Sequence, residues 1–245
     1  MHKFFTDEIE DSLAIISGDD HKHLSRVLRL KEGDSVMIND LNGVDYLAQI
    51  EVIEKQVTRV ELREKIEESN ESCLGVTLYQ GLPKAGKMDL IVQKATELGV
   101  NRIVPVITER VVVKSSSEFK KLDRLKRITL EAAKQSKRSR IPVIELPMDF
   151  HEVLQDMKKN EILIVPYENV ENYGFSALKK ELCELKSCGI LIGPEGGFTE
   201  DEIRSLREKG AKIVTLGNRI LRTETAGFTA ITMAQLLYGD MGGKI

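Results

Sequence analysis

Cysteine is scarce in this 245-residue chain, and long apolar runs are missing. The three cysteines, Cys73, Cys183 and Cys188, are odd in number and show no CxxC spacing, so we expect a reducing cytoplasm without a disulfide or zinc framework. No further Cys/His group accompanies the neighbouring His21 and His23, so no metal site is predicted there. Because no apolar stretch approaches a membrane span of about 20 residues, we expect a cytoplasmic globular protein that does not contact a membrane.

The chain also lacks an overall positive charge, which would be the simplest sign of a nucleic-acid partner. Its 36 Lys and Arg against 39 Asp and Glu give a net charge of -3. The distribution is uneven, however, because residues 110–140 hold 11 basic and three acidic residues. A concentrated basic segment forms a patch, and a patch binds polyanions whatever the overall charge of the protein.

Two kinds of hydrophobic periodicity divide the chain into two domains. Residues 1–70 alternate with the period of β-strands, with a hairpin signal at Asn42-Gly43 and a short helix over 20–30 that Asp19 or Asp20 would cap. The polar stretch 64–72 is interpreted as a linker. Strand-like and helix-like segments then alternate over residues 73–245, which predicts an α/β domain with a mainly parallel sheet. The expected strands are 74–80, 103–107, 142–146, 162–166, 190–192 and 213–216, and the expected helices are 88–98, 118–138, 150–158, 175–186, 200–209 and 224–238.

The last of these helices, residues 224–238, carries no charge after Glu224. A helix that is apolar or small on every face is buried. A second subunit buries a terminal helix more easily than the core of a domain of this size does, so we expect a homodimer, with burial in the chain's own core as the alternative.

The segment Gly81 to Met88 has the G-x4-G-K spacing of a phosphate-binding P-loop. Met88 stands where a Ser or Thr hydroxyl should hold Mg²⁺, and Pro83 removes a backbone donor from the loop. A positively charged loop at an RNA-facing edge is therefore favoured over a nucleotide-hydrolysing site.

The helix expected from residue 117 to 139 has an apolar face and a basic stripe. The stripe is formed by Lys120, Arg124, Arg127, Lys134 and Arg138. Few acidic residues of the same helix balance it, which favours RNA binding over a plain solvated face.

Two glycine-containing turns follow consecutive predicted strands near the C-terminus. The first is Gly193-Pro194-Glu195-Gly196-Gly197, and the second runs from Leu216 to Ala226. Ligands of open α/β sheets bind outside the carboxyl ends of the strands, so both turns should face one site. Glycine there allows the backbone to approach a ligand closely.

These turns closely resemble those of SPOUT-class RNA methyltransferases, specifically the RsmE family, which methylates N3 of a uridine in small-subunit (16S) ribosomal RNA. Matching segments extend along nearly the whole chain, at His23 to Leu30, Gln93 to Val100, Thr108 to Arg110 and Glu131 to Ser136. The resemblance implies a PUA-like RNA-binding β-barrel over residues 1–70, a SPOUT methyltransferase domain with a trefoil knot over residues 73–245, a homodimer and S-adenosyl-L-methionine as the methyl donor.

Under the hypothesis of an RNA methyltransferase, individual residues receive roles from their position and chemistry. The cofactor would lie against Pro166, Tyr167, Glu168, Ile192, Gly193, Gly196, Gly197, Leu216, Gly217, Ile220, Leu221, Thr223, Thr225 and Ala226. Arg222 would stabilise negative charge on the uracil oxygens, and Glu195 or Glu224 would accept the N3 proton, although Glu224 is equally suited to capping the last helix. The flanking RNA would be held by His23, Arg26, Arg29, Lys84, Arg110, Arg124, Arg127 and Arg138.

Two other functions stay open from the sequence. The first is a non-catalytic RNA-binding factor of ribosome assembly, which would keep the basic patch without using the cofactor. The second is the P-loop nucleotidase considered above, which requires Mg²⁺. In the methyltransferase interpretation, the partner is 16S ribosomal RNA or the small ribosomal subunit.

Overall fold

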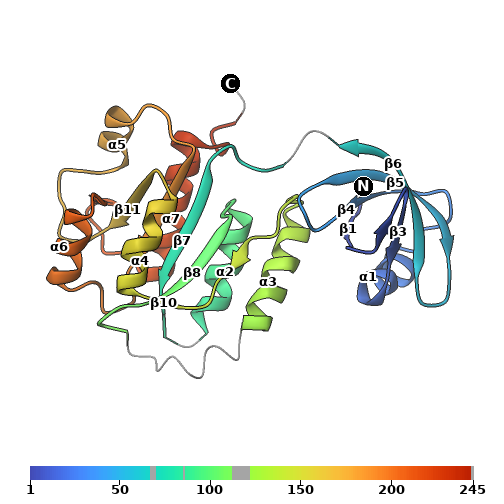
Figure 1. The fold of residues 1–245 in the computed structure, drawn as a ribbon, viewed down its shortest axis with the longest axis horizontal. Coiled ribbons are helices and arrows are strands. Elements are labelled where there is room, and N and C mark those ends of the chain that lie inside the picture. The colour runs from blue at the N-terminus through green and yellow to red at the C-terminus, as the bar shows by residue number, and fades with distance from the viewer. Residues whose placement is uncertain (67–69, 85, 112–121, 244–245) are drawn as a thin grey trace. The chain divides into compact units, whose positions relative to one another are not determined.

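The computed structural model describes residues 1–66, 70–84, 86–111 and 122–243. Its packing divides the chain into two compact units (Figure 1). The N-terminal unit comprises Met1–Glu71 together with Ala133–Ile141, and the C-terminal unit comprises Ser72–Ala132 together with Pro142–Ile245. Residues 133–141, which the sequence assigns to the second domain, thus pack with the first unit.

The N-terminal unit is built on a six-stranded sheet in the order β1-β4-β5-β6-β3-β2. Its strands are β1 Lys3–Phe5, β2 Ile9–Glu10, β3 Leu13–Ile16, β4 Ser35–Asn39, β5 Asp45–Ile53 and β6 Thr58–Ile66. The inward-facing residues of the period-two pattern form its core, which includes Val36, Ile38, Ile50 and Val60. The hairpin prediction is confirmed, because β4 and β5 pair antiparallel around a turn in which Gly43 has a φ of 97°.

Two expectations for this unit are wrong in detail. The short helix begins earlier than residue 20: α1 covers Gly18–Lys22 and continues as the π-helical turn η1, His23–Val27. Ser17, not Asp19 or Asp20, is its N-cap. Strand β6 extends to Ile66, into the expected linker, because the long partner strand β5 supplies ladder positions as far as Asp45. The rest of that linker includes 67–69, which lie outside the described residues.

The C-terminal unit confirms the predicted alternation of strands and helices. Its strands are β7 Gly75–Gly81, β8 Arg102–Ile107, β9 Val143–Ile144, β10 Met148–Asp149, β11 Ile162–Pro166, β12 Ser187–Ile192 and β13 Lys212–Val214. Its helices are α2 Lys87–Glu97, α3 Leu122–Gln135, α4 Phe150–Asp156 with the 3-10 turn η3 Met157–Lys159, α5 Phe175–Glu181, α6 Glu200–Glu208 and α7 Thr223–Tyr238. The first residues of the expected third helix, up to 121, lie outside the described part of the chain.

The seven-stranded sheet has the order β10-β8-β7-β12-β11-β13, with β9 beside β8, and each of its described pairs is parallel. Apolar cores lie on both faces. Leu78 of β7 joins the core under α2, α5 and α7, whereas the next residue, Tyr79, joins the core under α4 and α6. This three-layer arrangement (Figure 1) leaves the carboxyl edge of the sheet to loops, which is where a ligand site is expected.

A buried polar cluster ties the sheet to the layer of α4. Asp156 accepts a hydrogen bond of 2.7 Å from Tyr79 Oη and pairs with Arg102 and with Lys159. Burial alone would favour the neutral acid, but the hydrogen bonds from Arg102, Lys159 and Tyr79 lower the pKa of Asp156 to about 2. Asp156 is thus ionised at neutral pH and its partners satisfy it.

Several element bounds differ from the expectation, among them the start of β12 at Ser187 and the end of β13 at Val214. β9 is shorter than predicted, and β10 was not predicted at all. Helix α5 ends at Glu181 instead of residue 186 because the next residue, Leu182, is extended and Lys179 Nζ bonds the carbonyls of Cys183 and Leu237. None of the helices in the described ranges combines the length and apolarity that a membrane crossing requires.

Candidate active site

Loops that follow β11, β12 and β13 enclose a cavity of about 430 Å³ at the carboxyl edge of the parallel sheet. Its wall contains 12 of the residues that the sequence nominates, namely Pro166, Glu168, Ile192, Gly193, Glu195, Gly196, Gly197, Ile220, Leu221, Arg222, Thr223 and Ala226, together with Lys87, Pro194 and Phe198. A smaller cavity of about 80 Å³ shares part of this wall and adds Tyr167, Leu216 and Gly217. The two glycine-containing turns therefore face one site.

The first turn depends on missing side chains at two points. Gly197 has a φ of 67°, and a Cβ there would lie 3.3 Å from Glu168 Oε1. A Cβ at Gly196 would lie 3.1 Å from Arg110 Cβ, and Arg110 Nη1 donates to Gly196 O at 3.0 Å. Arg110, nominated for RNA, therefore also fixes the first turn.

Gly81, the last residue of β7, packs directly against this turn. It was not nominated from the sequence as a residue of the site. A Cβ at Gly81 would lie 2.6 Å from Pro194 N and 2.9 Å from Gly193 C. Both are backbone atoms that cannot rotate away. The floor of the cavity thus needs glycine at position 81 for close packing.

The hydroxyl of Thr223 joins the two turns. Thr223 is buried, and its Oγ1 donates to Gly193 O at 2.6 Å while it accepts from Gln80 Nε2 at 2.8 Å. Gln80 is fully buried at the end of β7. Thr223 therefore lies on the cavity wall as predicted, but its side chain is engaged by the protein.

Lys87, Glu195 and Glu224 form an ionic cluster at one side of the cavity. Lys87 Nζ lies 3.2 Å from Glu195 Oε1 and 3.2 Å from Glu224 Oε2. Glu195 also accepts the backbone N–H of Lys84 at 3.1 Å. Lys87 was not nominated from the sequence as a residue of this site. The P-loop-like spacing to which it belongs was the feature of the sequence that could have pointed to it.

The protonation states in this cluster follow from its contacts. Burial opposes ionisation of Glu195, but hydrogen bonds from its own backbone N–H, from Lys87 and from the Lys84 N–H lower its pKa below the usual value. Hydrogen bonds to Glu195 and then to Glu224 raise the pKa of Lys87. The ammonium and the Glu195 carboxylate are therefore both charged at neutral pH.

The second turn supplies exposed groups. Ile220 is 88% exposed, Gly217 has a φ of 106°, and Arg222 is exposed at the N-cap of α7. Among the nominated catalytic and cofactor-binding residues, all of which lie in the described chain, Glu224 and Thr225 are the two outside both cavity linings. Glu224 is nevertheless in contact with the wall through Lys87.

The nominated RNA-binding residues have different surroundings. His23, Arg26 and Arg29 are exposed in the N-terminal unit, and Lys84 and Arg127 are exposed in the C-terminal unit. Arg124 is exposed but pairs with Asp89 at 2.5 Å, and Lys134 pairs with Asp20 at 2.8 Å. Acidic residues from other segments thus balance much of the described stripe, and Lys120 lies outside the described residues.

Arg138 is the nominated residue that the structure removes from the surface. Its side chain is 4% exposed, and its Nη2 lies 2.5 Å from Glu71 Oε2. Glu71 also accepts the backbone N–H groups of Ser139 and Arg140. A guanidinium that is buried and paired in this way is not presented at the surface, where RNA would bind.

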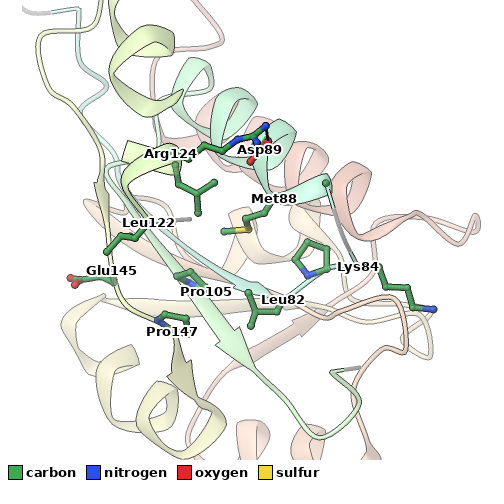
Figure 2. Close-up of a pocket in the computed structure, with 12 residues that line it drawn as sticks. Leu82, Lys84, Met88, Asp89, Pro105, Leu122, Arg124, Glu145 and Pro147 are labelled. Atoms are coloured by element: carbon green, nitrogen blue, oxygen red, sulfur yellow. Dashed lines mark hydrogen bonds and ion pairs between the residues drawn. The ribbon is translucent and has the colours of Figure 1, made fainter. Parts of the chain in front are cut away.

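A second, separate cavity of about 130 Å³ lies beside the 82–84 loop (Figure 2). Figure 2 shows Leu82, Met88 and Leu122 converging on it with Pro105, while the side chain of Lys84 points away. Most of its lining residues are apolar, and the charged ones are Lys84, Asp89, Arg124 and Glu145, none of which lines the large cavity.

Comparison with known proteins gives a consistent result. A family model described as an RNA methyltransferase domain matches residues 70–235, and one described as an RNA methyltransferase PUA domain matches residues 16–58. The ribosomal RNA small subunit methyltransferase E of Bacillus subtilis (strain 168) is 33% identical, covering 98% of this chain and 100% of that protein. The corresponding protein of Aquifex aeolicus (strain VF5) is 35% identical, covering 95% and 98%.

Solved structures agree in fold as well as in sequence. The crystal structure of a ribosomal RNA small subunit methyltransferase E from Neisseria gonorrhoeae, bound to S-adenosyl methionine, superposes with a TM-score of 0.85 at 33% identity and covers 98% of this chain and 99% of that one. The predicted fold class, a small PUA-like β-domain followed by a SPOUT-type α/β domain, is thereby confirmed. The chain belongs to the ribosomal RNA small subunit methyltransferase E family.

Proposed function

We propose that this protein transfers the methyl group of S-adenosyl-L-methionine to N3 of a specific uridine in 16S ribosomal RNA. The observation that carries the proposal is the cavity of about 430 Å³, because both nominated turns line it in a chain whose full-length relatives are named small-subunit methyltransferases. The Neisseria relative holds S-adenosyl methionine.

The walls of the cavity fit that cofactor. The first turn presents backbone without side chains at Gly193, Gly196 and Gly197, which suits a ligand that bonds to main-chain groups. Ile192, Leu221 and Ala226 add apolar surface of the kind that contacts an adenine ring. When bound, S-adenosylmethionine supplies an activated methyl group carried on a positively charged sulfur. Tyr167, Leu216, Gly217 and Thr225 would contact the cofactor as well.

The chain's own groups supply the remaining chemistry. Arg222 is exposed on the cavity wall and would donate to a uracil oxygen on which negative charge develops. Of the two carboxylates nominated to accept the N3 proton, Glu195 lines the cavity, whereas Glu224 contacts it through Lys87. The lowered pKa of Glu195 makes it a weak base, so it would relay the proton to water instead of keeping it.

Both units would contribute to RNA binding. In the N-terminal unit, His23, Arg26 and Arg29 are exposed, consistent with contacts to the phosphate backbone. In the C-terminal unit, the corresponding groups are Lys84, Arg110, Arg124 and Arg127. The target base would leave its stack to reach the cavity.

Assembly and location extend the same proposal. Helix α7 buries Ala230, Ile231 and Ala234 in the core of its own unit, yet Leu236 on the same helix is 55% exposed. The support for a homodimer in which a second copy covers this helix is that α7 carries no charge after Glu224, at its exposed positions as well as at its buried ones. We also propose that the C-terminal domain contains a trefoil knot and that the protein is cytoplasmic. The proposed domains are residues 1–70 and 73–245.

Isothermal titration with S-adenosylmethionine, followed by methylation of isolated small subunits, tests the proposed function. We expect saturable cofactor binding and formation of N3-methyluridine. A protein that binds ribosomal RNA but shows neither property would be the non-catalytic assembly factor, and the proposal would be abandoned.

A further inference from the structure

Lys87 is the part of the P-loop-like spacing for which the proposed function has no role. The preceding residue, Gly86, is the N-cap of α2 with a φ of 87°, and Lys87 is the first residue of the helix. Its side chain lies on the wall of the large cavity and is 30% exposed. The lysine of this motif therefore faces the candidate active site.

The two carboxylates hold the ammonium in a fixed position. Lys87 Nζ is 3.2 Å from Glu195 Oε1 and 3.2 Å from Glu224 Oε2, so the two acids grip it from the first turn and from α7. Glu195 is itself fixed by the backbone N–H of Lys84, and the side chain of Glu224 is only 14% exposed. An ammonium held by two anchored partners loses little further freedom when a third group binds.

An ammonium has three N–H donors, and two carboxylate oxygens of the described chain lie 3.2 Å from it as ion pairs, of which Glu224 Oε2 accepts no hydrogen bond within the described residues. At least one donor therefore remains on a side chain that borders the cavity. A free donor on a fixed cation is suited to an oxygen that becomes negative during a reaction.

Resting on the proposed function, we propose that Lys87 is a catalytic residue whose remaining N–H donates to a carbonyl oxygen of the target uracil and stabilises the ring anion. The N3–H bond breaks, its proton goes to solvent water, and the electron pair stays on the ring, spread over N3 and both carbonyl oxygens. The new bond from N3 to the methyl carbon replaces the carbon–sulfur bond of the donor, whose electron pair remains on sulfur.

The charged groups around Lys87 determine whether its side chain acts as a cation or as a base. Glu195 and Glu224 face it from the first turn and from α7, and Arg222 and Glu168 lie on the same cavity wall. The two carboxylates keep Lys87 protonated, so it acts as a cation and not as a base. Removing it would leave two carboxylates unneutralised near the ring, which raises the pKa of uracil N3.

Single-turnover methylation of isolated small subunits by Lys87→Met, measured from pH 6 to pH 10, tests the inference. We expect a rate about 100-fold below wild type at neutral pH, because a donor to a developing anion typically contributes that much. We also expect the plateau of the pH–rate profile to move about one unit or more toward alkaline pH. Lys87→Arg, which keeps the charge, should recover at least about a tenth of the wild-type rate.

Lys94→Met is the matched control. Lys94 lies on the same helix and pairs with Glu97 at 2.8 Å. It should leave rate and pH profile unchanged. Cofactor affinity, measured by isothermal titration, should stay within about threefold of wild type in both Met variants.

The possible results distinguish a failure of the role of Lys87 from a failure of the proposed function. A Lys87→Met rate within about fivefold of wild type, an unshifted pH profile, or a loss of cofactor affinity that accounts for the lost rate would each overturn the role of Lys87. If Lys87→Met unfolds, Lys87→Gln is measured in its place under the same criteria. A wild-type protein that binds the cofactor but forms no N3-methyluridine would reject the proposed function itself.

Discussion

Gly81→Ala should deform the floor of the candidate active site more than its single added methyl group suggests. The new Cβ would lie 2.6 Å from Pro194 N, 2.7 Å from Pro194 Cδ and 2.9 Å from Gly193 C. These atoms belong to the backbone and to a proline ring, so no rotamer change relieves the overlap. Forcing extra volume into packed structure costs about 1–3 kcal/mol, and we expect the upper end of that range here.

The loss can be measured by thermal unfolding. For a chain of this size each 1 kcal/mol shifts Tm by about 2–4 °C, so about 3 kcal/mol should lower Tm by about 6–12 °C. Because the displaced Gly193 and Pro194 line the large cavity, the Kd for S-adenosylmethionine should also rise at least about tenfold, as measured by isothermal titration.

Gly75→Ala is the control, because it places the same methyl group at the other end of β7. Its Cβ would lie 3.5 Å from Lys186 O, an ordinary contact, and alanine in a strand costs less backbone entropy than glycine. We expect an unchanged or slightly raised Tm and normal cofactor affinity. If Gly81→Ala behaved like Gly75→Ala in both measurements, the close approach of β7 to the first turn would not shape the site.

Three further predictions concern RNA, catalysis and pH. The double variant Arg124→Glu with Arg127→Glu should weaken RNA binding, while cofactor affinity stays normal. The slope of log affinity against log salt should fall by about one unit for each lost phosphate contact. A wild-type slope would show that these residues contact solvent and not RNA. Arg222→Ala should slow single-turnover methylation about 100-fold with cofactor affinity nearly unchanged, and a near-normal rate would refute its catalytic role. Asp156 has a pKa lowered to about 2, so its stabilising contribution of about 2 kcal/mol is present above pH 4 and is lost as pH falls toward 2. The Tm advantage of wild type over Asp156→Asn should therefore shrink across that range, and a constant difference would contradict the assignment.

The sequence predicts the layered fold well because local patterns encode it. Residues 162–166 read as a short, continuously apolar run, as expected for a strand covered on both faces, and β11 has the predicted bounds. The convergence of the two turns also follows from the sequence, since carboxyl ends of parallel strands share one edge. Because the strands are parallel, the two turns lie at the same edge of the sheet however far apart they are in the chain.

Contacts between side chains from different elements are not encoded locally. Lys87, Glu195 and Glu224 meet across three elements, and no spacing in the sequence indicates that they do. The G-x4-G-K spacing describes one loop and cannot tell whether its lysine will meet a phosphate or a carboxylate.

Arg138 shows a different reason for failure. The basic stripe assumes that the helix continues to residue 139, but α3 ends at Gln135 and Lys137 has a φ of 58°. The chain turns there, and Arg138 pairs with Glu71 in the N-terminal unit instead of extending the stripe. Helical periodicity assigns a residue to a face only as far as the helix lasts.

Methylation of 16S ribosomal RNA by this protein can be tested by mass-spectrometric mapping of modified uridines in that RNA from cells that lack the protein. We predict that one N3-methyluridine is missing, and that purified protein with S-adenosylmethionine restores it on small subunits isolated from those cells. A complete set of N3-methyluridines in the deficient cells, with no methyl transfer by the purified protein, would show that this protein does not methylate N3 of a 16S uridine.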